Sequence, residues 1–178
     1  MSLPELLRDK RSAILSLWKE LTLEVYAEES ARFIKSEKDR FNNPVGESIN
    51  SGLETLFDGL LGGRPADEME QALDGIVRIR AVQDLSPSQG VGFVFLLKRA
   101  IREQAGDALA GGEALTELSV LEARIDSIAL AAFDIYARCR QQICDIRVNE
   151  IRHLTSKLLE RAERADSGNG HLKGGSEA

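Results

Sequence analysis

The last third of the chain is a long run without helix breakers. No Gly or Pro occurs from Glu113 until Gly168, and residues that favour helix continue throughout. This predicts one helix from Glu113 to Ala165, roughly 80 Å long at about 1.5 Å per residue. A domain of this size is narrower than that. We therefore expect the far end of the helix to protrude or to meet a partner.

Two apolar stripes of different phase run along this predicted helix. The first consists of Leu118, Leu121, Ile125, Ile128, Ala132, Ile135 and Cys139. The second consists of Cys144, Val148, Ile151, Thr155, Leu158, Ala162 and Ala165. We expect the first stripe to pack within the domain or in a dimer. The second predicts a short coiled-coil-like extension, with candidate partner-binding residues Val148, Ile151, Leu158 and Ala162.

Helical spacing of apolar residues also dominates the rest of the chain, and the period-two alternation of strands is missing. The fold class is therefore predicted to be all-α, with about six helices and a long C-terminal one. Besides Glu113–Ala165, the expected helices cover Ser2 to about Leu21, Ser30–Lys38, Pro44–Leu61, Pro65–Asp84 and Ser86 to about Ala105. Residues 1–165 are interpreted as one domain. Residues 166–178, rich in Gly, Ser and charge, are expected to be disordered.

Charge and composition narrow the partners and the compartment. The chain has 29 acidic and 23 basic residues and a net charge of -6, so its surface should repel nucleic acid and anionic lipid. The longest apolar stretch, Val91–Leu97, is too short to span a bilayer, and charges in Ser2–Arg11 do not suit a signal peptide. With two Cys and two His, we expect a cytoplasmic protein without nucleic-acid binding or membrane insertion.

Metal and haem sites have little support in the sequence. Glu150 and His153 have the E-x-x-H spacing of di-iron bundles, but the second histidine, His171, lies in the predicted tail. No C-x-x-C-H motif is present for covalent haem, and His153 is poorly placed for an axial ligand. Cys139 and Cys144 point about 140° apart on a helix, so we interpret them as packing residues rather than a redox pair. No cofactor is expected.

The densest cluster of polar residues lies at the end of the predicted fourth helix, just before the Ser86 cap. It consists of Arg78, Arg80, Gln83 and Asp84. One interpretation is ion pairing of the arginines with acidic residues such as Asp74 or Glu103. The other is contact with an anion or a partner protein. Asp134 and Arg138, spaced i,i+4, predict a local ion pair, and no catalytic constellation is present.

The region around this polar cluster resembles a known family. The run from Ala72 to Ser88, followed by Val91–Phe95, is similar to the N-terminal domain of RsbRD-type stressosome co-antagonists. The most specific part is the junction that starts at Arg78 and ends with Ser86 and Pro87. Further similarity lies at Asn43–Val45, Gly52–Leu53, Asp134–Tyr136 and Cys139–Arg140, and the resemblance covers roughly residues 5–160.

The resemblance implies a globin-like helical domain without haem, which dimerises through its last helices and serves as a sensory or regulatory input. In larger relatives the long final helix leads to a phosphorylatable STAS domain that controls a kinase and an anti-sigma pathway. This sequence ends at Ala178 without such a domain. We therefore expect that it is not itself the phosphorylated co-antagonist, and that any signal passes by binding. The family supplies no catalytic residues.

Three functions remain as hypotheses at this point. The first is a non-enzymatic sensor or adaptor of bacterial stress signalling, a homodimer through its last two helices that also binds a regulatory partner protein. The second is an accessory subunit of a redox or respiratory enzyme complex, docked through the same long helix. The third is a metal or haem protein acting on a redox substrate, which an absorption spectrum and elemental analysis would test.

Overall fold

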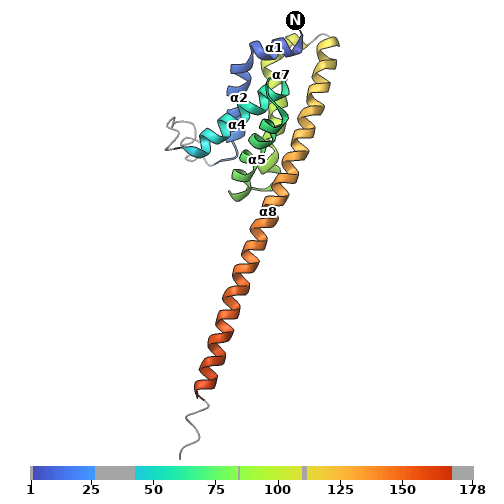
Figure 1. The fold of residues 1–178 in the computed structure, drawn as a ribbon. Coiled ribbons are helices and arrows are strands. Elements are labelled where there is room, and N and C mark those ends of the chain that lie inside the picture. The colour runs from blue at the N-terminus through green and yellow to red at the C-terminus, as the bar shows by residue number, and fades with distance from the viewer. Residues whose placement is uncertain (1, 27–42, 84, 110–111, 170–178) are drawn as a thin grey trace, which may run out of the picture. The chain divides into compact units, whose positions relative to one another are not determined.

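The computed structural model describes residues 2–26, 43–83, 85–109 and 112–169 (Figure 1). These residues form seven α-helices and one 3-10 helix, with no strand in the described ranges. The elements are α1 (Leu3–Asp9), α2 (Arg11–Leu23), α4 (Pro44–Leu60), α5 (Ala66–Val82), α6 (Pro87–Val91), α7 (Phe93–Ala105), the 3-10 helix Gly106–Leu109 and α8 (Gly112–Asn169). The all-α prediction is confirmed, and the arrangement is consistent with a globin-like domain.

Several sequence predictions concern residues outside these ranges. The predicted helix Ser30–Lys38, the candidate residue Asp84 and the tail from residue 170 onward lie outside the described residues. The long helix is confirmed as continuous, and its backbone extends past Ala165 to Asn169. None of the described helices is both long and apolar enough to cross a membrane.

Two of the predicted helices are each split in two. The first breaks at Lys10, whose ammonium group donates to the carbonyl oxygen of Gln104 at 2.6 Å. The helix expected from Ser86 to Ala105 breaks at Gly92, where an added Cβ would lie 2.5 Å from the carbonyl oxygen of Ser88. Apolar periodicity missed both breaks because the spacing of buried residues continues across them.

Residues 1–139 form one compact unit around a single apolar core. Helix α2 packs on α7, and the Trp18 indole N–H, in the core, donates to the carbonyl oxygen of Phe93 at 2.7 Å. Helix α4 packs closely on α5, because Gly52 leaves the space that Ile76 fills. The first stripe of α8 packs within this core, with only Ile128 partly exposed, which confirms that part of the prediction.

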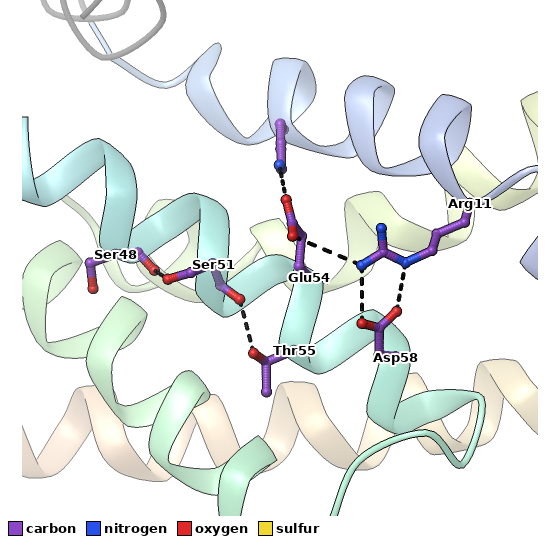
Figure 2. Close-up of polar contacts among 7 residues, drawn as sticks. Arg11, Ser48, Ser51, Glu54, Thr55 and Asp58 are labelled. Carbon is purple, nitrogen blue, oxygen red and sulfur yellow. Dashed lines mark hydrogen bonds and ion pairs between the residues drawn. The ribbon is translucent and has the colours of Figure 1, made fainter. Parts of the chain in front are cut away.

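Ion pairs between side chains of α2 and α4 join the two helices (Figure 2). Arg11 donates from Nε and Nη2 to the two carboxylate oxygens of Asp58, at 2.7 and 3.0 Å. Lys19 pairs with Glu54 at 2.6 Å. Because these groups are partly exposed, each pair contributes no more than about 1 kcal/mol. They join the partly exposed sides of the two helices, whose buried sides pack in the apolar core.

Residues 140–178 form the second unit, of which the α8 segment is described. Every side chain from Cys144 to Arg164 is exposed, and only Arg140 and Ile143 in this segment are partly covered. From Cys144 to Arg164 the helix therefore has no tertiary packing against the described part of the chain. It displays its apolar side chains to solvent.

Candidate functional site

The side chain of Arg80 is fully buried at the junction between α5 and α6, with 0% exposure. It donates from Nε to the carbonyl oxygen of Gly90 at 3.1 Å and from Nη2 to that of Gln89 at 2.8 Å. Its guanidinium carbon lies 5.4 and 5.2 Å from the ring centres of Tyr26 and Phe93. Burial lowers the pKa of Arg80, but arginine remains charged at neutral pH.

This placement corrects the expectation that Arg80 pairs with a carboxylate. Of the two suggested acids, Asp74 pairs with Arg78 and Glu103 pairs with Arg99. The i,i+4 pair of Arg78 and Asp74 is exposed, as the first interpretation predicted. An intermolecular contact by Arg80 would require its side chain to leave this buried position.

Tyr26 joins the segment after α2 to the same junction. Its hydroxyl accepts a hydrogen bond from Nη1 of Arg80 at 3.3 Å and donates one to Oε1 of Gln83 at 2.8 Å. Burial raises the pKa of Tyr26, while the nearby Arg80 opposes this shift. Gln83 thus makes an internal contact at the end of α5.

Helix α8 contacts the junction through Tyr136. The Tyr136 hydroxyl donates to the carbonyl oxygen of Leu85 at 2.5 Å. Its ring occupies the space beside Gly90, where an added Cβ would lie 2.4 Å from the ring. Ser86 and Gln89 form the predicted capping box between these contacts. The junction is therefore held by α5 through Arg80 and by α8 through Tyr136.

Sequence reasoning identified the arginines and the cap but missed Tyr26, Gly90 and Tyr136. The chain has two tyrosines, and both bond to this junction. Buried tyrosine hydroxyls need a polar partner, so these two residues were a usable signal. Their partners are distant in sequence, which no local spacing reveals.

We expect Gly90→Ala to lower the free energy of unfolding by about 1–3 kcal/mol, because the new methyl group would overlap the Tyr136 ring. Gly75→Ala is the matched control, since its nearest neighbour would be the Ser48 hydroxyl at 4.0 Å. In the middle of α5 this control should be stabilising by roughly 0.5–1 kcal/mol. Urea denaturation measures both, and equal effects would contradict the packing described.

Large apolar side chains are exposed on α7 and α8 near the ion pairs that join these two helices. The two helices run antiparallel, joined by Lys98 with Asp126 at 2.6 Å and by Arg102 with Glu122 at 2.8 Å. One turn beyond the first pair lie Phe95 on α7 and Leu130 on α8, and Phe133 follows. We call Phe95, Leu130 and Phe133 the outer patch. All three are among the exposed large hydrophobic residues of the protein.

The second unit displays the second apolar stripe predicted from the sequence. We call Cys144, Val148, Ile151, Thr155, Leu158 and Ala162 the seam. All are exposed, including Ile151 at 63% and Leu158 at 64%. Leu154 and Leu159 flank the seam and are also exposed. The candidate partner-binding residues of α8 therefore lie together on one helix face.

Other predicted polar features stay apart. In the described part of the chain, no ion pair joins Asp134 to Arg138, so that prediction is wrong; both side chains are exposed beside a pocket between α4, α5 and α8. Glu150 and His153 are exposed on the α8 segment of the second unit. No cluster of three or more potential metal ligands occurs among the described side chains.

Comparison with known proteins identifies a family whose sequence model matches most of the chain. Residues 15–150 match the sequence model of the family described as the RsbT co-antagonist protein rsbRD N-terminal domain. No curated protein and no solved structure matches the chain. The matched range includes the whole α5–α6 junction, the outer patch and the start of the seam.

Proposed function

The chain belongs to the RsbT co-antagonist protein rsbRD N-terminal domain family, and from this premise we propose that it is a non-enzymatic sensor or adaptor in bacterial stress signalling. It works by forming a homodimer and by binding a regulatory partner protein. The observation that carries this proposal is the apolar surface exposed at the outer patch and along the seam. Its acidic charge and two free cysteines suit the cytoplasm.

The outer patch supports self-association of the first unit. Phe95, Leu130 and Phe133 come from two neighbouring helices and expose large apolar side chains beside the Lys98–Asp126 pair. Apolar clusters that are rimmed by charges commonly mark protein interfaces. A second copy can present the same residues in return, as a two-fold interface requires.

The seam supports self-association of the second unit. Its spacing alternates between three and four residues, with Val148, Thr155 and Ala162 in heptad position a. Cys144, Ile151 and Leu158 then occupy position d. A helix with this repeat buries its apolar face against a helix of the same kind. Because the seam is exposed in the single chain, a second copy is the occupant that we propose.

The flanking residues favour a parallel pair of helices. In a parallel coiled coil, a g residue faces the e residue five positions further along the other chain. Two of the resulting pairs are favourable, namely Arg140 with Asp145 and Leu154 with Leu159. The third pair, Arg147 with Arg152, is repulsive, but it is exposed and therefore screened by salt. An antiparallel pair centred on Leu154 would instead place Arg147 of each helix beside Arg161 of the other. Two repulsive contacts would form in that arrangement.

The mass of the native particle tests the proposal. Light scattering should give twice the chain mass of 19.6 kDa at micromolar concentration. Covering the exposed side chains of the outer patch and the seam is the driving force that we propose for the dimer. A particle of 19.6 kDa at all concentrations would contradict the proposed mode of action.

A further inference from the structure

A pocket of about 420 Å³ opens where α1, the end of α4 and the start of α8 meet. Its floor is apolar and is formed by buried side chains of the core, namely Leu3, Leu7, Leu60 and Leu121. Val120 lines one wall and is 62% exposed. The volume lies within the range of about 300–1,000 Å³ that is common for small-molecule sites.

The rim of this pocket carries more positive than negative charge. It contains two arginines, Arg8 and Arg124, and one carboxylate, Glu117. Glu117 already accepts the backbone N–H of Leu3 at 2.7 Å, and Arg8 donates from Nη2 to the carbonyl oxygen of Leu61 at 3.0 Å. Arg124 is exposed and has no hydrogen bond or ion pair with any other described residue. Its guanidinium is therefore available to an anion.

We propose that this pocket binds a free medium-chain fatty acid, with the alkyl chain on the leucine floor and the carboxylate at Arg124. The planar guanidinium of arginine matches a carboxylate with two parallel hydrogen bonds. The apolar floor and the cationic rim together select an amphiphile with an anionic head. Neither a neutral sugar nor a cationic amphiphile has this complementarity.

This site is separate from the proposed dimer surface. Arg124 lies about 180° around α8 from Phe133 of the outer patch, given about 3.6 residues per turn. A ligand in the pocket would touch α1, α4 and α8 at once, because all three helices line it. The inference therefore does not rest on self-association, and a monomeric protein could still bind the fatty acid.

Titration of the full chain with decanoate below its micellar concentration, followed by amide NMR shifts, tests the proposal. Saturable shifts should be centred on Leu3, Val120 and Arg124. Each methylene removed should weaken binding about fourfold, so octanoate should bind roughly fifteen-fold less tightly than decanoate. Decyltrimethylammonium, which has the same chain and a cationic head, should bind at least tenfold more weakly.

Arg124→Gln should weaken decanoate binding at least tenfold, because it removes the charge-assisted hydrogen bonds. The matched control is Arg138→Gln, which changes an exposed arginine beside a second apolar pocket lined by α8 and should bind decanoate like the unchanged protein. Three results would overturn the proposal: equal affinities of the two variants, equal binding of the cationic amphiphile, or shifts only with phospholipid vesicles.

Discussion

Replacing Arg80 with methionine should lower the free energy of unfolding by roughly 3–5 kcal/mol. Methionine fills a similar volume but donates no hydrogen bond, so the carbonyl oxygens of Gln89 and Gly90 lose a buried partner. Each such loss costs about 1–3 kcal/mol, and the contacts with the Tyr26 and Phe93 rings are lost as well. The substitution also removes the desolvation penalty of the buried Arg80 charge. This gain offsets part of the cost and keeps the net loss within the stated range.

Arg78→Met is the matched control for this change. Arg78 lies on the same helix but is exposed and paired with Asp74 at i,i+4, so its loss should cost no more than about 0.5 kcal/mol. Urea denaturation followed by Trp18 fluorescence measures both variants, since Trp18 is bonded to Phe93 beside the junction. Effects of equal size would show that the buried contacts of Arg80 do not stabilise the fold.

The pair of changes Ile151→Asp and Leu158→Asp should convert the dimer to monomer. Each apolar side chain buried at an interface contributes roughly 1.5–3 kcal/mol, and the changes occur in both chains. The combined loss is comparable with the about 8 kcal/mol that holds a micromolar complex. Because both residues are exposed in the single chain, the circular dichroism and unfolding of the first unit should not change.

The control pair is Ile146→Asp with His153→Asp. Ile146 is 59% exposed, similar to Ile151, but lies about 140° around the helix from it. This pair adds the same charge to the same segment and should leave the dimer intact. If light scattering instead showed that both pairs of variants stay dimeric, the seam would not hold the chains together, and the outer patch would carry the association alone.

Local sequence signals predicted the parts of the fold that depend on nearby residues. Ser86, Pro87 and Gln89 specify the start of α6 through a capping box, and the structure has that cap. The absence of Gly and Pro after Glu113 predicted the continuous α8. The stripe from Leu118 to Cys139 was predicted to be covered, either within the domain or in a dimer, and the structure places it in the core. A three-to-four spacing marks one helix face but does not say what covers it.

Contacts between distant residues decided the features that the sequence did not reveal. Arg80 was expected at a surface or in an ion pair, but its acceptors are backbone carbonyl oxygens, which no side-chain pattern displays. Tyr136 reaches Leu85 across 51 positions. At the break, Gly92 lies so close to the carbonyl oxygen of Ser88 that a Cβ would overlap it, and the hydropathy pattern gives no sign of this approach. Spacing alone could not place these groups together.

Oxidative cross-linking through Cys144 is the sharpest test of the parallel dimer. Cys144 is exposed at a d position of the seam, where side chains of parallel, in-register helices meet at distances that suit a disulfide. In a Cys139→Ser background, mild oxidation should convert the protein to a covalent dimer. The control is Ile146→Cys in a chain whose two native cysteines are replaced by serine. After the same oxidation this variant should remain largely without the covalent cross-link. The proposed pairing would be contradicted if the Cys144 protein and the control variant cross-linked at the same rate, or if neither protein cross-linked.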